Sequence, residues 1–543
     1  MGARQVLCGL VLLLGASAAA AARADELLER YRRAREVSER EAVVEALRGD
    51  PAGAAALGEV LRADPEERVR LKAVAALLEL GTDQAARTLL QAIDRWDPFV
   101  VDAAVRGLAA RGLPAATAEW VLEHGLREGT PDQQAALVTL LSALERGEAL
   151  PAIRKAAAKE RPWRLRAAAA TALSHLDPAG SWKDLRRLAG DAELRVRVAA
   201  LEGLERVPGE AAWKLLRKAA RSDSAWQARL AALRAMTARD RAGARALLVE
   251  VLPDHDLHLA LRLAALEGLE GWQDPQGVEA RIQALRAAEG RLEAALVRSL
   301  QALTGQPHRT HEEWKAWWRA AKEGFAFPAA APPATDDPMR TRVRFYDLPL
   351  ESTCLCFVID ASGSMSEPAG QGTHTAGQGT AGAAAAPAGP TKWEVARKEL
   401  EKALDALPES ASFGLVLFHE RVVPLQTTPV KASKRNIAAA LRLLDQHPPA
   451  GPTDLYGPLA QLFHAGEPSD PDAAARVAFD TLVVLSDGLP TAGDVQDTDE
   501  LLRRVEGFNR FARVRIHCVG LGAQNRPLLE GLARASGGRY AAR

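Results

Sequence analysis

The chain is 543 residues long, 48% of its residues are hydrophobic, and its 70 basic and 70 acidic side chains give a formal net charge of zero. One hydrophobic core rarely serves a chain of this length, so we expect two to four domains. The balanced charge excludes the broad basic field that attracts nucleic acid, and we expect no nucleic-acid partner.

Residues 1–24 have the pattern of a secretory signal peptide. Arg4 gives a positive start, residues 6–14 form a short apolar run, and small residues surround Arg23 near a cleavage point. An uncleaved membrane anchor is the alternative, but the apolar run is shorter than the roughly 20 residues that a membrane span needs. We therefore expect an exported protein, periplasmic, secreted or on the cell surface, that contacts the membrane only if this segment stays uncleaved.

Residues 25–305 repeat a helical unit rich in Ala, Leu and Arg. Residues 68–77 and 195–204 share one pattern, and its last position recurs at Leu77, Leu108, Leu140, Leu173, Leu204, Met236, Leu269 and Leu303. By subtraction the spacings are 31, 32, 33, 31, 32, 33 and 34 residues. A steady period in this range predicts an all-α solenoid of helix pairs. The unit resembles the HEAT repeat, a resemblance that specifies architecture well and function poorly.

Residues 306–325 form a distinct tryptophan-rich segment after the last repeat. Trp314, Trp317 and Trp318 share one face of a predicted helix. An array of repeats needs a cap on its last open face, and three tryptophans supply a large apolar area. Capping is our interpretation, and an exposed aromatic surface for a ligand is the alternative. Residues 326–340, with four prolines, predict a stiff extended linker.

Residues 341–543 alternate short apolar runs with amphipathic stretches. Strands are predicted at 342–346, 354–359, 413–418, 481–485 and 514–519, and helices at 392–406, 436–444, 455–464, 498–511 and 527–535. Such alternation predicts an α/β doubly wound, Rossmann-like domain with a parallel sheet covered on both faces. Its ligand site is expected at the carboxyl ends of the strands.

The second predicted strand runs directly into a cluster of oxygen-bearing side chains. Residues 357–365 read Phe-Val-Ile-Asp-Ala-Ser-Gly-Ser-Met, which places Asp360, Ser362 and Ser364 at alternating positions. Carboxylate and hydroxyl oxygens are ligands for a hard divalent cation such as Mg²⁺, not for zinc or copper. Gly363 allows the loop to approach an ion closely.

This Asp-x-Ser-x-Ser pattern resembles the metal-ion-dependent adhesion site of von Willebrand factor type A (VWA) domains. That family adds a Thr from a second loop and an Asp from a third. By resemblance, Thr453 in residues 449–457 and Asp487 in residues 482–488 take these roles. The chain departs from the family at Pro452, where glycine is common, and we expect this proline to push Gly451 toward an extended conformation.

Residues 367–390 interrupt the domain just after the first loop. The segment is rich in Gly, Ala, Thr and Gln, a composition that predicts disorder. Because the insertion begins beside the metal loop, it would either shield the ion or help to select a partner. A tolerated surface insertion without a function is the alternative.

The resemblance implies a binding protein, in which the five residues hold Mg²⁺ (or Mn²⁺/Ca²⁺) and leave one position open for the Asp or Glu carboxylate of a protein partner. A site whose ion only stiffens the loops is the alternative. We do not expect an enzyme, because no His follows in a setting that would activate Ser362 or Ser364. No phosphate-binding glycine loop is present, so we expect no nucleotide. The second candidate function is an accessory VWA subunit of a chelatase-type ATPase assembly machine, which export argues against.

Overall fold

The computed structural model describes residues 19–94, 97–328, 343–369, 389–464, 466, 470–521 and 526–543. Much of the predicted signal peptide, linker and insertion lies outside the described residues, so these three assignments stay predictions. The chain divides into two compact units, Met1–Arg239 and Asp240–Arg543, and each is treated by itself. Within the described ranges, no helix is both long and apolar enough to cross a membrane.

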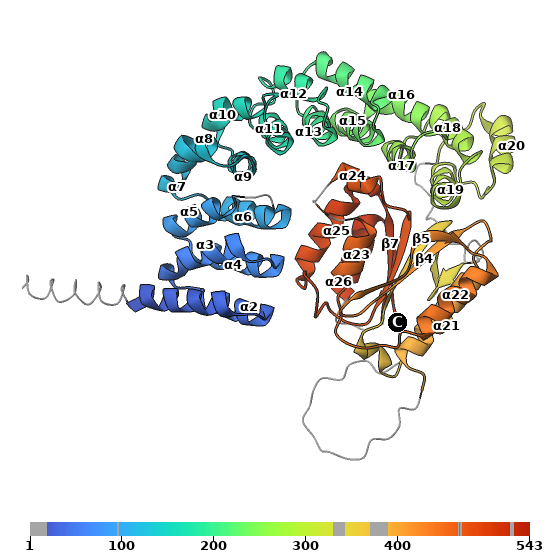
Figure 1. The fold of residues 1–543 in the computed structure, drawn as a ribbon. Helices are drawn as coiled ribbons and strands as arrows, with labels where there is room; N and C mark the ends of the chain where they lie inside the picture. The colour runs from blue at the N-terminus through green and yellow to red at the C-terminus, as the bar shows by residue number, and fades with distance from the viewer. Residues whose placement is uncertain are drawn as a thin grey trace, which may run out of the picture. The chain divides into compact units, whose positions relative to one another are not determined.

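The first unit is a row of helix pairs, as the repeat predicted (Figure 1). Alternate helices stack in one layer, in which α2, α4, α6, α9, α11, α13 and α15 each contact the next. The side chains at the repeated position, from Leu77 to Met236, are buried inside this stack of helices. The helices are α2 (Val37–Leu47), α3 (Ala54–Ala63), α4 (Glu67–Leu80), α5 (Asp83–Ala92), α6 (Pro98–Arg111), α7 (Ala115–Trp120), α8 (Leu126–Glu128), α9 (Pro131–Ala143), α10 (Leu150–Ala156), α11 (Trp163–Leu176), α12 (Trp182–Leu188), α13 (Leu194–Gly203), α14 (Glu210–Ser222) and α15 (Trp226–Arg239).

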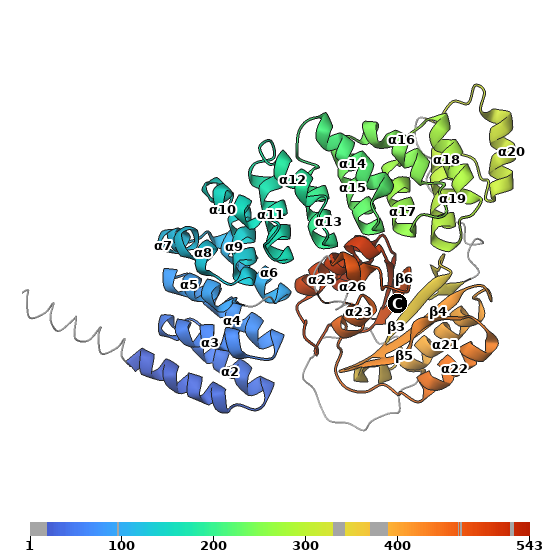
Figure 2. The same cartoon turned by 45° about the horizontal axis from the view of Figure 1, so that its top comes forward.

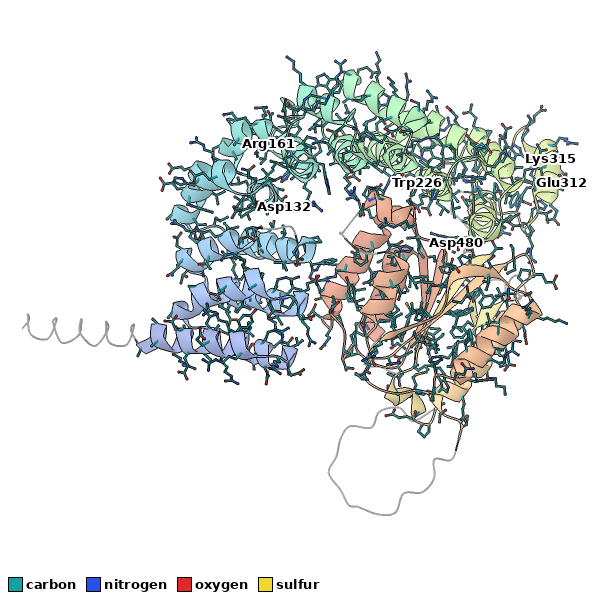
Figure 3. All side chains as sticks on the ribbon, in the orientation of Figure 1. Asp132, Arg161, Trp226, Glu312, Lys315 and Asp480 are labelled. Carbon is teal, nitrogen blue, oxygen red and sulfur yellow. The ribbon has the colours of Figure 1, made fainter. Side chains whose placement is uncertain are left out.

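A ladder of ion pairs links one repeat to the next. An Arg in the first turns of a stacked helix reaches an Asp that precedes the following one, and the same Asp accepts a backbone N–H at the start of that next helix. The pairs are Arg40–Asp64, Arg70–Asp97, Arg166–Asp191 and Arg197–Asp223. The link from α9 toward α11 is of another kind. There Arg161, labelled in Figure 3, donates a hydrogen bond to the side chain of Gln134.

Asp191 shows how such a pair is held. Its Oδ1 atom is 2.7 Å from Nη2 of Arg166 and also accepts the N–H of Glu193 at 2.9 Å. Burial by itself raises the pKa of Asp191, but the hydrogen bonds from Arg166 and the Glu193 backbone lower it below the usual range. Asp191 is therefore a charged carboxylate that binds both Arg166 and the backbone of Glu193 inside the stack.

The second unit begins with α16 (Arg241–Val251), α17 (Leu259–Gly268), α18 (Pro275–Leu285), α19 (Gly290–Thr304) and α20 (His311–Ala321). Helix α20 carries the predicted tryptophan face and packs against α18. Trp314 and Trp318 are buried, and Nε1 of Trp318 lies 3.3 Å from Oε1 of Glu279 on α18. This packing agrees with a capping role for the aromatic face.

A six-stranded sheet follows, with the order β5-β4-β3-β6-β7-β8 (Figure 2). Five of its strands are parallel, as predicted. The exception is β5, which pairs antiparallel with β4 because a connection of only three residues is too short for a crossover. A separate hairpin precedes the sheet. The strands are β1 (Arg344–Phe345), β2 (Leu348–Pro349), β3 (Cys354–Asp360), β4 (Ser412–Phe418), β5 (Val422–Lys431), β6 (Thr481–Ser486), β7 (Arg515–Gly520) and β8 (Tyr540–Ala542).

Helices cover both faces of this sheet, which confirms the predicted α/β class (Figures 1 and 2). Alternate residues of β3 and β4 point into a core under α21 and α22, while α23, α25 and α26 lie on the opposite face. The helices are α21 (Lys392–Asp405), α22 (Lys434–Asp445), α23 (Tyr456–Leu462), α24 (Pro471–Ala474), α25 (Thr498–Ala512) and α26 (Arg526–Ser536).

Within this second unit, α19 contacts the chain next to the amino ends of the strands. Glu351 accepts hydrogen bonds from Arg298 of α19 and from Arg515 of β7. Arg291, at the start of α19, donates to the backbone carbonyl of Asp480, which is labelled in Figure 3. These contacts lie at the opposite end of the strands from the predicted metal loops, so they leave that edge free.

Replacing Asp191 by Ala removes the acceptor of the Glu193 N–H and leaves Arg166 without its carboxylate in a site that is nearly closed to water. We expect the free energy of unfolding to fall by about 2–4 kcal/mol, as measured by urea denaturation followed by circular dichroism. Asp102→Ala is the matched control, since that carboxylate pairs with Arg106 on the surface and its loss should cost less than about 1 kcal/mol. Equal losses in both variants would contradict a structural role for the ladder.

His517 on β7 makes stability depend on pH. Burial, assisted by the charge of Arg515, lowers the pKa of His517 from 6.5 to about 3, so the folded protein keeps the ring neutral where the unfolded chain protonates it. Stability from this group is complete above pH 6.5 and is lost as pH falls toward 3, by up to about 1.4 kcal/mol per pH unit.

The variant His517→Asn keeps an acceptor for the N–H of Arg539 but does not titrate. We expect its free energy of unfolding to change less steeply than that of the wild type between pH 6.5 and 4, in urea titrations at fixed ionic strength. Identical slopes would show that His517 is not the group responsible.

Candidate metal centre

The first loop begins at the last residue of the central strand β3. Asp360 is fully buried, and its Oδ1 atom accepts the backbone N–H of Ser362 at 2.8 Å. The chain then enters a short 3₁₀ turn, Gly363–Ser366, which contains Ser364. The carboxylate and both hydroxyls of the predicted motif are therefore gathered within five residues at the carboxyl end of the strand.

The neighbouring strand β6 supplies a hydrogen bond to Asp360 that the sequence analysis did not predict. Oγ of Ser486 lies 2.6 Å from Oδ2 of Asp360. Strands β3 and β6 are parallel and in register up to Ile359 and Leu485, so the next residue of each strand lies beside that of the other. Burial raises the pKa of Asp360 to about 6, although the hydrogen bonds from Ser486 and Ser362 oppose this shift. The Asp360 carboxylate is thus compensated by hydrogen bonds from Ser362 and Ser486, with no ion pair to it among the described residues.

A chain of hydrogen bonds connects the first loop with the third. Oγ of Ser362 is 3.1 Å from Oγ of Ser364, and Ser364 in turn donates to Oδ1 of Asp487 at 2.8 Å. Asp487 follows β6 directly, and its side chain is closed to water. Two predicted ligands from the first loop and one from the third therefore lie together.

The second loop packs on the first through its backbone. The N–H of Gly363 donates to the carbonyl of Gly451 at 2.9 Å, and the N–H of Ala450 donates to that of Ala361 at 2.8 Å. Thr453 is buried beside the third loop, where its N–H donates to Oγ1 of Thr491 at 3.0 Å. The predicted Thr453 thus lies in the loop that touches the Asp360 loop.

Gly451 differs from our expectation of an extended conformation before Pro452. Its φ is +73°, in the left-handed region that favours glycine. With this φ the Gly451 carbonyl receives the N–H of Gly363. The close contact between the two loops, rather than the proline alone, determines the backbone here.

Asp454, next to Thr453, serves the helix that follows. Its Oδ1 atom accepts the N–H of Gly457 at 2.9 Å, next to the start of α23. Burial raises its pKa. This position explains the residue as a cap rather than as a general base.

A positive side chain that the sequence analysis did not consider lies against Asp487. Nζ of Lys392 is 2.8 Å from Oδ2 of Asp487 and 2.8 Å from Oε2 of Glu367. Burial alone lowers the pKa of Lys392, but these two carboxylates raise it overall. Lys392 comes first in α21, just after the insertion, so no motif in the sequence connects it with Asp487.

The donor set matches a hard divalent cation. Asp360, Ser362, Ser364 and Asp487 offer only oxygen atoms, and Thr453 adds a hydroxyl from the adjoining loop. Among the described residues there is no group of three or more His, Cys, Asp and Glu side chains arranged to hold a metal. The candidate centre has two carboxylates and otherwise hydroxyls, which suits Mg²⁺ better than it suits zinc.

Two family descriptions match the chain. Residues 54–140 and 150–237 match HEAT repeats, and residues 385–542 match the von Willebrand factor type A domain. The second match begins at residue 385, within the insertion at 367–390, so the first loop with Asp360 precedes it. The structure nevertheless places β3, which carries that loop, in the middle of the matched sheet.

Individual proteins resemble parts of the chain. Inter-alpha-trypsin inhibitor heavy chain H1 from Mesocricetus auratus is 29% identical over 171 residues, which cover 31% of this chain and 16% of that protein. A von Willebrand factor type A structure from Catenulispora acidiphila is 21% identical, with a TM-score of 0.25, and the match covers 35% of this chain and 38% of that one. The complex of CpcE and CpcF of phycocyanin lyase from Nostoc sp. PCC7120 is 20% identical, with a TM-score of 0.24, over 45% of this chain and 93% of that one.

The chain therefore combines an N-terminal series of HEAT repeats with a C-terminal VWA domain, a domain type that indicates a role in binding other proteins.

Proposed function

We propose that this protein is an exported adhesion or scaffold protein, whose VWA domain binds an acidic group of a protein partner through a divalent cation. Asp360, Ser362, Ser364, Thr453 and Asp487 would hold the ion. The observation that carries the proposal is the hydrogen-bonded chain from Ser362 through Ser364 to Asp487, which brings two loops together at the carboxyl edge of the sheet.

The chemistry of these residues suits recognition. A bound Mg²⁺ would supply a positive centre that attracts the Asp or Glu carboxylate of a partner. Because the other predicted ligands are neutral hydroxyls, only two carboxylates reduce the charge of the ion. Burial raises the pKa of Asp360, and a cation beside it would favour the charged form of this carboxylate.

The surroundings of the two serines favour binding over catalysis. Ser364 is hydrogen-bonded to Ser362 and Asp487, and within the described ranges no His joins this chain of contacts. A hydroxyl nucleophile would need such a base. Asp454, another acidic residue near these loops, accepts the backbone N–H of Gly457 and is explained by that contact.

The HEAT repeats would add a second surface to this arrangement. Stacked helix pairs form an extended scaffold on which a partner can be held at several points. A VWA contact that depends on a metal, together with such a scaffold, would join two or more proteins outside the cytoplasm.

The full-length chain should bind Mg²⁺ saturably in calorimetric titrations at millimolar concentrations. The double variant Asp360→Ala, Ser362→Ala removes one carboxylate and one hydroxyl, and we expect it to lose at least tenfold in affinity. Ser410→Ala, an exposed serine that precedes β4 at the other end of the strand, should bind like the wild type.

Saturable binding that is unchanged in the double variant would place the ion elsewhere. Absence of binding by the wild type up to about 10 mM Mg²⁺ would contradict a resident cation. Circular dichroism must show that the variants are folded before either result counts.

Export has its own test. In the native host, the mature chain should begin near Asp25, after removal of residues 1–24, and should fractionate outside the cytoplasm. Mass spectrometry of the intact purified protein gives its starting residue. A chain that retains Met1 and stays in the cytoplasm would contradict export and favour the accessory subunit of an ATPase.

A further inference from the structure

Lys392 is a cationic side chain in direct contact with the candidate metal centre. Its Nζ lies 2.8 Å from Oδ2 of Asp487, and the carbonyl of Ser364 is 3.5 Å away. The side chain is 13% exposed, and that of Asp487 is fully closed to water. Charges so poorly screened by solvent interact strongly.

The backbone holds Lys392 in this place. Its N–H donates to the carbonyl of Glu367 at 2.9 Å, and the N–H of Ala369 donates to the carbonyl of Pro390 at 2.9 Å. Thr391 caps α21, with its Oγ1 accepting the N–H of Glu394 at 3.2 Å. The two ends of the insertion are thereby joined, and Lys392 emerges from this junction toward Asp487.

The charges around the centre indicate the electrostatic effect of Lys392. Asp360 and Asp487 contribute two negative charges that are closed to water, and Lys392 offsets one of them. Glu367 also contacts Lys392, but its side chain is 64% exposed and its charge is screened by solvent. With a divalent cation bound, the buried part of the centre carries one net positive charge, instead of none without the lysine.

We propose that Lys392 determines the ligand specificity of this centre, by weakening its hold on the divalent cation while strengthening the attraction of the loaded centre for an anionic carboxylate. This inference rests on the proposed function. Because Asp487 already has a cation beside it, the bound ion is less fully neutralised and keeps more of its charge for the ligand. Lys392 is a positioning and specificity-determining residue, and it does not itself hold the ion.

The test compares full-length wild type with Lys392→Gln, which keeps an N–H donor toward Asp487 but removes the charge. Mn²⁺ affinity is measured by calorimetry. Binding of acetate, the smallest carboxylate probe, is measured from broadening of its methyl proton signal by the Mn²⁺-loaded protein. We expect Lys392→Gln to bind Mn²⁺ at least fivefold more tightly and acetate at least threefold more weakly.

Two controls separate charge from structure. Lys392→Arg keeps the charge and should stay within about twofold of the wild type in both measurements. Lys398→Gln removes an exposed lysine further along α21 and should also match the wild type. If Lys392→Gln proves unfolded by circular dichroism, Lys392→Met is the second neutral variant, with the same expectations.

The outcomes distinguish this inference from the proposed function. Saturable Mn²⁺ binding by the wild type with the same affinity in the neutral variant would overturn the role of Lys392 alone. So would unchanged or tighter acetate binding, because a purely structural lysine affects stability and not ligand preference. Absence of Mn²⁺ binding in both proteins would overturn the proposed function together with the inference.

Discussion

The parallel pairing of β3 with β6 is the constraint on which the candidate site depends. Because the two strands run in the same direction and in register, both end at the same edge of the sheet. Asp360 then lies beside Ser486, and Asp487 lies within reach of Ser364. A slip of one residue would turn one of the two carboxylates toward the opposite face. The chemistry of the site is thus a consequence of strand register.

Burial of the two carboxylates makes their negative charges costly unless hydrogen-bond donors or cations compensate them. Asp360 accepts hydrogen bonds from Ser362 and Ser486, and within the described ranges no cationic side chain forms an ion pair with it. Burial raises its pKa to about 6. Asp487 differs, because Lys392 lies against it. The two carboxylates therefore differ, since Asp487 is paired with a cationic side chain and Asp360 is held by hydrogen bonds from Ser362 and Ser486. This difference underlies the role that we propose for Lys392.

The helical repeats also contain buried carboxylates, and each of these is paired with an arginine. Each Asp of the ladder is placed between layers of helices, where an unpaired charge would be costly, and an Arg from the preceding layer neutralises it. The same carboxylate accepts a backbone N–H at or just before the start of the following helix. A single residue type thus links adjacent repeats and orients the next one, which explains why Asp recurs at the starts of these helices.

The local pattern of residues was sufficient to predict the two architectures, since periods of 31 to 34 residues and alternating apolar runs report on secondary structure directly. It also indicated Asp360, Ser362 and Ser364 as candidate ligands, because these three residues are close in the chain. Strands β5 and β8 were not predicted: β5 contains Pro424 and Pro429, which an edge strand tolerates, and β8 has only three residues.

The positions of Ser486 and Lys392 were decided by the tertiary structure alone. Ser486 comes 126 residues after Asp360, and only the pairing of two strands brings their side chains together. Lys392 follows a long insertion, and its approach to Asp487 depends on where α21 begins. The sequence by itself determined which chemical groups are present and which helices and strands they belong to. The tertiary structure decided which charges meet, because electrostatic interactions depend on distances between atoms rather than on separation along the chain.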